Sequence, residues 1–355
     1  MRVLHVLETL AAGGVETTFL SVLRHLPRRE MVHHVLAFDG GALEAEYRAV
    51  AADVTIERRS GVLEETLARA PYDVAHVLFE RCAERLLPCL LTRTSTRVVY
   101  GKNYDFCGQW RSTEGFVSHA DAAMLEAADA VTFTTSALAD SYGAALASRG
   151  LVLGKGADVT AFMALLPAGP HVGDRILAIA NPTPRKRLGD LIEALAGIRR
   201  AVPAAHVRIV GIGDATEVAR LRALAADTGM SKYVVLAGGT RDVGSELDRA
   251  RVVALPSGSE GVPTAILEAM AASRPVVVTD AGHVRSIVDD GVEGFVVPVG
   301  DVAALADRLS RVLDDRPLAA EMGRRGRLRA SGHHVEAIAE RLSAHLLAAC
   351  GPSCH

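Results

Sequence analysis

The feature that most constrains the fold is the regular alternation of short apolar segments with amphipathic helical patterns along most of the chain. Residues 3–7, 33–38 and 176–180 are short apolar runs of the kind that forms buried strands. Residues 188–200 repeat their apolar positions at the helical period. Strands that alternate with helices predict βαβ units, in which helices cover both faces of a parallel sheet. The sequence therefore predicts an α/β protein.

Chain length predicts two such domains, because 355 residues exceed what one core of about 150–200 residues usually holds. The Pro- and Gly-rich segment 165–174 is the best candidate linker, and a second alternating series follows it. We expect an N-terminal domain over residues 1–168, a C-terminal domain over residues 169–332, and a last amphipathic helix within residues 333–355.

Composition excludes several classes of partner. Hydrophobic residues make up 49% of the chain and charged residues 23%, which allows two buried cores. The formal net charge is −3 and no basic block with interleaved aromatics exists, so nucleic acid is not an expected partner. No apolar run reaches 18 residues, so we expect no transmembrane segment, and peripheral membrane contact stays open.

Localisation is predicted from the start of the chain and from the cysteines. Residues 1–7 form too short an apolar run for a signal peptide. The five cysteines lack the spacing of a zinc site or a disulfide framework. We therefore expect reduced cysteines and a cytoplasmic protein.

The segment 257–278 carries the strongest site signal. An apolar strand, a Gly/Ser turn, a helix that opens near Pro263 and another apolar strand follow one another there. Pro263 suits the first helical position, where a missing N–H costs nothing. The loop would then direct the backbone N–H groups of Val262, Thr264 and Ala265 toward an anion such as a phosphate.

Two carboxylates flank this predicted anion site at different depths. Glu260 lies in the loop just before the helix, and Glu268 lies about a turn and a half inside it. We interpret the loop as the holder of a nucleotide diphosphate, with one carboxylate on the sugar side and the other on the ribose side.

A basic turn is expected at the same edge of the second sheet. Residues 181–189 read N-P-T-P-R-K-R-L-G directly after a strand and place Arg185, Lys186 and Arg187 at its carboxyl end. These cations would neutralise a diphosphate and help a leaving group depart. A solvated basic turn is the alternative.

Glycine-containing turns follow three other strands. Gly13 and Gly14 separate the first strand from the first helix, where they permit close approach of a ligand or form a plain tight turn. Gly211 and Gly213 resemble a dinucleotide fingerprint only weakly, since Thr216 replaces the third glycine, and we expect them beside a nucleotide. The turn over residues 238–243 would meet a base through Arg241 or the main chain, or is an ordinary turn.

The loop over residues 101–115 interrupts the alternation and is the candidate acceptor site. Long loops at the carboxyl ends of parallel strands commonly bind ligands. Its mixture of aromatic and polar side chains could grip a hydroxylated molecule, although an ordinary surface loop is an equal alternative. The predicted acceptor-binding residues are Glu16, Asn103, Tyr104, Trp110 and His119.

No metal site is predicted from the histidines. His5, His25, His119 and His283 have no ligand spacing to one another or to carboxylates, and isolated histidines are more often structural than metal-bound.

Residues 260–271, E-G-V-P-T-A-I-L-E-A-M-A, resemble the E-x7-E motif of retaining glycosyltransferases of family four. That family has the GT-B fold of two facing Rossmann-like domains with a cleft between them. Residues 13–16 look like its N-terminal glycine loop, Gly156 and Asp158 look like its N-G-x-D turn, and residues 186–194 are similar to its K-G-x-x-x-L-I-E-A segment. Residues 275–297 are similar to its C-terminal part.

The resemblance implies a nucleotide-sugar donor, most commonly a UDP-sugar, and a hydroxylated glycan or small natural product as acceptor. It also implies retention of the anomeric configuration, no metal or other cofactor, and a last helix that packs back on the first domain. Glu260, on the donor sugar, and Lys186, on the diphosphate, would be the catalytic residues, and Glu268 would hold the ribose. The donor-binding residues implied or inferred are Gly14, Asn181, Arg185, Lys186, Gly211, Gly213, Arg241, Gly261, Val262, Pro263, Thr264, Ala265 and Glu268.

The chain departs from the family pattern at three places. Asn181 stands where an Arg usually precedes the phosphate Lys, so Arg185 or Arg187 would replace it. Lys155 stands at the Asn of N-G-x-D, and Asn103 or a neighbour stands at a common His. Three alternatives remain: an epimerase or phosphorylase on the same fold, a nucleotide-sugar-binding protein without transfer, and an NAD enzyme.

Overall fold

The structure is a computed structural model that describes residues 1–57, 72–78, 82, 96–102, 123–142, 146, 149–154, 159–165, 167 and 172–351. It divides into two compact units. Unit 1 comprises Met1–Gly156 and Val335–His355, and unit 2 comprises Ala157–His334. Asn103, Tyr104, Trp110, His119, Gly156 and Asp158 lie outside the described residues.

The boundary between the units differs from the predicted one after residue 168. Val159 is fully buried in the core of unit 2, and Phe162, Met163 and Leu165 pack against that core. Apolar contacts therefore attach the short helix α8 (Thr160–Met163) to unit 2, although the Pro and Gly content of the following segment suggested a linker there.

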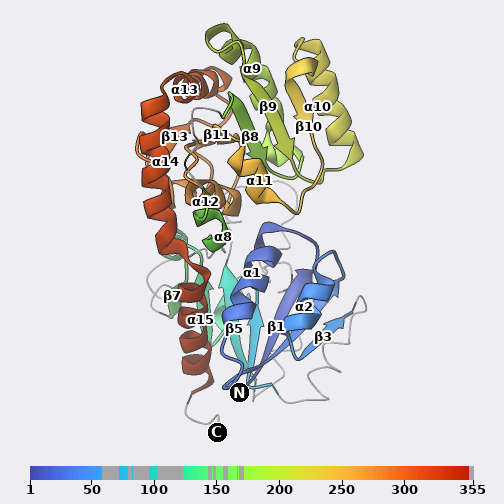
Figure 1. The fold of residues 1–355 in the computed structure, drawn as a ribbon. Helices are drawn as coiled ribbons and strands as arrows, with labels where there is room; N and C mark the ends of the chain where they lie inside the picture. The colour runs from blue at the N-terminus through green and yellow to red at the C-terminus, as the bar shows by residue number, and fades with distance from the viewer. Residues whose placement is uncertain are drawn as a thin grey trace. The chain divides into compact units, whose positions relative to one another are not determined.

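Unit 1 contains a parallel sheet with the strand order β3-β2-β1-β4-β5-β6-β7, drawn in blue to green in Figure 1. The strands are β1 (Arg2–Thr9), β2 (Val32–Asp39), β3 (Asp53–Ile56), β4 (Val74–Val77), β5 (Arg97–Lys102), β6 (Ala130–Phe133) and β7 (Gly150–Val152). The helices of this unit include α1 (Gly14–His25), α2 (Glu44–Val50), α6 (Ser136–Ser141) and α15 (Val335–Cys350).

Helix α15 belongs to unit 1 although it ends the sequence. It packs on α1 and on strands β4 and β5. Val335, Ile338, Leu342 and Leu346 recur at helical spacing and lie in the same core as the strands of this sheet. An apolar stripe of this width is what a helix needs to pack on a sheet.

Unit 2 contains a second parallel sheet, with the order β10-β9-β8-β11-β12-β13. The strands are β8 (Arg175–Ile179), β9 (His206–Val210), β10 (Val234–Leu236), β11 (Val252–Leu255), β12 (Val276–Thr279) and β13 (Gly294–Val297). The helices are α9 (Leu188–Ala201), α10 (Ala215–Asp227), α11 (Val243–Asp248), α12 (Thr264–Ala271), α13 (Val302–Asp314) and α14 (Arg316–Ala330). The strand order reverses between β8 and β11, and open α/β sheets bind ligands at such a switch point.

Two details of unit 2 differ from the sequence-based expectation. Pro263 is the N-cap of α12 and not its first helical residue, so the helix begins at Thr264. Helix α14 was not predicted, because its buried side is built largely from small residues among many arginines. A Cβ on Gly323 would lie 2.3 Å from the Ser273 carbonyl oxygen, so the close approach of α14 to the end of α12 requires glycine.

The described residues contain no helix that combines the length and hydropathy of a membrane span. Cys350 is disulfide-bonded, which corrects the expectation that every cysteine is reduced. Cys82 is buried and forms no disulfide.

Candidate functional site

The candidate site of unit 2 lies where the loop after β8 meets the loop after β11. These two strands are hydrogen-bonded neighbours at the switch point of the sheet. The Gly258 N–H donates to the Arg185 carbonyl at 2.8 Å, and the Arg185 guanidinium donates to the Ser259 carbonyl at 2.7 Å. The basic turn and the carboxylate loop, far apart in sequence, are therefore tied together as the sequence predicts.

The central contact of the site is an ion pair between Lys186 Nζ and Glu260 Oε1. The Lys186 side chain is 16% exposed and that of Glu260 only 6%. Burial lowers the pKa of Lys186, and the adjacent Glu260 carboxylate opposes that effect. A second cation stands nearby, because Arg185 Nη1 lies 3.6 Å from Glu260 Oε2.

Arg187, the third cation of the basic turn, faces another partner. Its Nε and Nη2 atoms donate to the Asp190 carboxylate at 2.8 and 3.2 Å. Its backbone has φ of +46°, in the left-handed region, where it turns the chain into α9. Arg185 rather than Arg187 therefore accompanies Lys186 at Glu260.

Two residues that were not predicted from the sequence, Gly282 and Thr279, contact the loop that carries Glu260. Gly282 has φ of +58°, and a Cβ there would lie 1.8 Å from the Glu260 carbonyl oxygen. The Thr279 hydroxyl donates to the Ser257 carbonyl at 2.5 Å. The sequence signal for this support is a glycine three residues after an apolar strand, which is too common to identify a site.

Helix α12 begins beside this loop. Gly261, Val262 and Pro263 are buried, whereas Thr264 and Ala265 are half-buried. In a helix that starts at Thr264, the Ala265 N–H has no carbonyl partner in the same helix. A donor at a positive helix end suits an anion.

Glu268 lies inside α12, deeper than Glu260. Desolvation raises the pKa of its carboxyl to about 7. Within the described part of the chain its side chain has no hydrogen-bond or ion-pair partner. This carboxyl therefore retains a proton over much of the neutral range and can donate as well as accept a hydrogen bond.

A pocket opens next to the basic turn, between the loops that follow β8, β9 and β10. Its lining includes Pro182, Gly211, Ile212, Gly213, Gly238 and Gly239. Asn181 joins two of these loops, because its Oδ1 accepts the Ile212 N–H at 3.0 Å. The Ile212 side chain is 71% exposed. Arg241 is exposed and is not among the residues that line this pocket.

The two glycines of the G-x-G sequence have a local structural role. A Cβ on Gly211 would lie 2.1 Å from the Ala180 carbonyl oxygen, and one on Gly213 would lie 2.6 Å from Pro182 Cβ. They let the loop after β9 pack against the loop after β8. This packing explains why both positions are glycine, so a bound dinucleotide is not needed to explain them.

Gly14 and Glu16 belong to unit 1, at the start of α1. Gly14 is the first helical residue and Gly13 is the N-cap. Glu16 is only 7% exposed, and its carbonyl accepts the Tyr47 hydroxyl at 2.7 Å. A Cβ on Gly13 would lie 2.2 Å from Glu16 Oε2, so the Glu16 carboxylate packs against the glycine turn.

No cluster of three or more His, Cys, Asp or Glu residues within the described ranges could hold a metal ion.

The two parallel sheets and the switch-point site define a two-domain Rossmann-like protein of the GT-B class. Residues 171–329 match the family model of glycosyl transferases group 1. The chain is 30% identical over 314 residues to the GDP-mannose-dependent alpha-(1-6)-phosphatidylinositol monomannoside mannosyltransferase of Mycobacterium tuberculosis, over 82% of this chain and 80% of that protein. The chain therefore belongs to the glycosyl transferases group 1 family.

Other similarities agree with this assignment. The chain is 33% identical over 150 residues to the amylovoran biosynthesis glycosyltransferase AmsK of Erwinia amylovora, a match that covers 40% of this chain and 36% of AmsK. The structure of HepE from Anabaena in complex with UDP-glucose is similar with a TM-score of 0.86 at 19% identity, over 98% of this chain and 100% of HepE. Sucrose-phosphate synthase from Thermosynechococcus elongatus is similar with a TM-score of 0.83 at 18% identity, over the same shares of the two chains.

Proposed function

We propose that the protein transfers a sugar from a nucleotide-diphosphate donor to a hydroxyl of a glycan or small natural product, with retention of the anomeric configuration. The observation that carries the proposal is the joining of Lys186, Arg185 and Glu260 at the switch point of the unit 2 sheet, beside the start of α12. Both cations and the helix end supply positive potential where a leaving diphosphate would gain negative charge.

The proposed donor fits the site in three parts. The diphosphate takes Glu260's place as the partner of Lys186 and meets the first N–H groups of α12. The sugar lies at the released Glu260 carboxylate, which orients its hydroxyls. The ribose lies at Glu268, whose partly protonated carboxyl is suited to hydrogen bonds with hydroxyl groups.

The transfer step follows from this placement. The bond between the anomeric carbon and the diphosphate oxygen breaks, and the acceptor oxygen bonds to the same face of that carbon. The departing phosphate oxygen takes the acceptor proton. Lys186 and Arg185 stabilise the charge on the leaving group, and positioning of the acceptor supplies the remaining catalysis.

We propose the base of the donor from the nucleotides named for two similar proteins. HepE was crystallised with UDP-glucose, which supports a uridine donor. The mycobacterial relative is named for GDP-mannose, which makes a guanosine donor the second candidate. For either base, the proposed subsite is the pocket lined by Ile212 and Gly239.

Thermal unfolding with UDP, GDP and their sugar conjugates tests the donor, because a ligand that binds only the folded state raises its stability. We expect a UDP-sugar to raise the unfolding midpoint most. A positive donor is then incubated with hydroxylated acceptors, with and without a chelator, and transfer is expected in both cases. Donor consumption without acceptor would instead indicate an epimerase, a requirement for inorganic phosphate a phosphorylase, and binding without turnover a non-catalytic protein.

We also propose that the reaction takes place in the cytoplasm, where nucleotide-sugar donors are available. Fractionation of cells that produce the tagged full-length chain tests this location, and recovery of the chain outside the cytoplasmic membrane would contradict it.

A further inference from the structure

The pocket of unit 2 has one charged side chain among its described lining residues, that of Arg222 on α10. The pocket encloses about 500 Å³, part of which is open solvent, and its other lining residues are glycines, a proline and apolar residues. Val218, one helical turn before Arg222, lines the same pocket, so both residues lie on one face of the helix. Arg222 was not predicted as a site residue, whereas Arg241, which was, is absent from this lining. The positive charge at the pocket therefore comes from a helix and not from the turn after β10.

Arg222 has its hydrogen-bond donors available for a ligand. The residues three and four positions away from it on α10 are alanines and Val218, so no carboxylate lies within helical reach. Glu217, in the first turn of α10, pairs with Arg220 at 2.8 Å. Among the described residues, Arg222 takes part in no hydrogen bond, ion pair or ring contact. Binding of a ligand to Arg222 therefore breaks no contact within this part of the chain.

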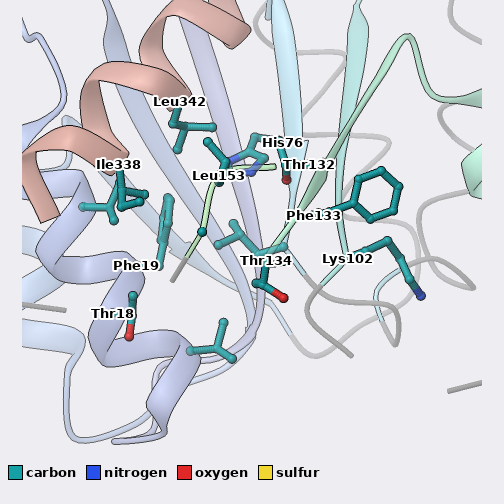
Figure 2. Close-up of a pocket in the computed structure, with 15 residues that line it drawn as sticks. Thr18, Phe19, His76, Lys102, Thr132, Phe133, Thr134, Leu153, Ile338 and Leu342 are labelled. Carbon is teal, nitrogen blue, oxygen red and sulfur yellow. The ribbon is translucent and has the colours of Figure 1, made fainter. Parts of the chain in front are cut away.

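The pocket of unit 1 shows the opposite arrangement. Its lining includes Lys102, which is only 1% exposed. The Lys102 ammonium lies 5.3 Å from the centre of the Tyr142 ring and 5.9 Å from that of Tyr100. Figure 2 shows the end of Lys102 pointing away from His76. That cation is engaged by the protein itself, whereas Arg222 is exposed.

The floor of the unit 2 pocket treats all bases alike. The Gly211 N–H donates to the Gly238 carbonyl at 2.9 Å and joins the loop after β9 to the loop after β10. Gly238 has φ of +74°, in the left-handed region that favours glycine. A base that packs on glycine backbone and on exposed Ile212 gains contacts that depend little on its identity, because every base has a similar face. Discrimination between bases must therefore come from a side chain with directional donors.

A guanidinium group supplies that discrimination because it has five N–H donors and no acceptor. Uracil presents the acceptor O4 on its edge, and guanine presents O6 and N7. Cytosine and adenine carry an amino group at the equivalent position, which is a donor. An amino N–H that faces a guanidinium N–H leaves both donors without an acceptor, which costs binding free energy. A guanidinium at the base therefore favours keto bases over amino bases.

We propose that Arg222 is a specificity-determining residue that selects donors with a keto base, uracil or guanine, and rejects those with cytosine or adenine. The inference rests on the proposed function and on the placement of the base at this pocket. It agrees with both candidate donors, UDP-sugars and GDP-sugars, and excludes CDP-sugars and ADP-sugars.

Two pairs of nucleotides test the proposal, each matched except at the edge of the base. UDP is compared with CDP, and inosine diphosphate with ADP, since hypoxanthine lacks the additional 2-amino group of guanine. Isothermal titration of the full-length chain gives the four Kd values. We expect each keto nucleotide to bind about fivefold to tenfold more tightly than its amino partner, the low end of the range for an arginine contact to a base, because Arg222 is exposed.

Variants assign the preference to the side chain. Arg222→Met removes every donor and keeps an unbranched side chain, so both ratios should fall to about one while the Kd for inorganic pyrophosphate stays unchanged. Arg222→Lys keeps donors without an acceptor and should retain part of the preference. Arg200→Met is the matched control, because Arg200 is an exposed arginine of α9 outside the pocket lining, and it should leave both ratios as they are.

The outcomes separate this inference from the proposed function. If the unchanged protein binds keto and amino nucleotides equally, Arg222 does not select the base and the inference is wrong. If Arg222→Met weakens all four nucleotides and pyrophosphate to the same extent, Arg222 attracts the phosphates, which also overturns the inference. Both results leave the nucleotide-sugar donor intact. If none of the four nucleotides binds, the proposed donor fails and this inference fails with it.

Discussion

Both units contain a parallel sheet whose strand order reverses at one point, but the polar residues at that point differ: an ion pair in unit 2 and neutral histidines in unit 1. In unit 2, Lys186 and Glu260 come from loops that follow β8 and β11. In unit 1, His5 and His76 lie within β1 and β4, the two strands at the corresponding reversal of strand order. Loop residues keep enough solvent contact to remain charged in an ion pair, whereas strand residues buried on both faces lose their charge. The position of a polar residue relative to the end of its strand thus decides which ligands each edge can bind.

The largest effect is expected from removal of Lys186 at the charged edge, which is the set of loops in unit 2 that carries Lys186, Arg185 and Glu260. We expect Lys186→Met to lower kcat/KM for sugar transfer by about 10²–10³-fold, because one preorganised group that stabilises transition-state charge contributes about that much. Lys232→Met is the matched control, since Lys232 is an exposed cation elsewhere in unit 2. Equal activity of both variants would remove Lys186 from the catalytic assignment.

The second test concerns the ion pair itself, which must open before Lys186 can bind a phosphate. Glu260→Gln removes the competing carboxylate and its repulsion of the diphosphate. We expect the Kd for the nucleoside diphosphate to fall about tenfold, which corresponds to about 1.4 kcal/mol, while transfer is lost. Isothermal titration measures the Kd. Weaker binding in this variant would show that Glu260 supports the diphosphate rather than competes with it.

The charged edge could be predicted from sequence because its residues follow recognisable strands. Helix α10 and strand β9 occupy the predicted residues, and parallel strands bring their carboxyl ends to one edge whatever their register. Lys186 and Glu260 are 74 residues apart and still meet there. The spacing of the residues did not predict the hydrogen bond between Arg187 and Asp190. That contact depends on the left-handed backbone conformation of Arg187.

The cluster of neutral histidines in unit 1 could not be predicted in the same way. His5, His33 and His76 meet through the lateral order and register of β2, β1 and β4, for which a single sequence carries no signal. Of these three, only His5 was considered as a possible ligand from the sequence, and it was interpreted as an isolated histidine. Helix α14 was missed for a related reason, since its packing relies on glycines that lower helix propensity.

A third test uses pH, because the two edges respond in opposite directions. The folded pKa values of His33 and His76, about 4 and about 3, lie below the ordinary value of 6.5, so the unfolded chain binds more protons. Their contribution to the free energy of unfolding therefore falls as pH decreases from about 6.5 toward 4. The pKa of Glu268, about 7, lies above the ordinary 4.5, so its contribution falls as pH rises from about 4.5 to 7.

Unfolding midpoints at pH 5 and pH 7.5 separate these contributions. His33→Asn should reduce the loss of stability at pH 5, and Glu268→Gln should raise the midpoint at pH 7.5. A difference of about 1 kcal/mol would move the midpoint of a unit of this size by about 2–4 °C. Amide hydrogen exchange assigns each change to one unit, and an acid response confined to unit 2 would contradict the histidine account.

The smallest expected effect lies at the pocket of unit 2, where an apolar side chain stands next to the charged turn. Ile212 is 71% exposed and approaches Gly239, and a Cβ on Gly239 would lie 2.6 Å from Ile212 Cγ1. A base stacked on Ile212 would cover part of that apolar surface. Ile212→Ala should then weaken binding of the nucleoside diphosphate about threefold to tenfold and leave binding of inorganic pyrophosphate unchanged. Exposed Val299, in the same unit but outside the residues that line this pocket, provides the control in Val299→Ala. If Ile212→Ala weakened pyrophosphate and nucleotide equally, Ile212 would act through the basic turn to which Asn181 ties it, and the base would lie elsewhere.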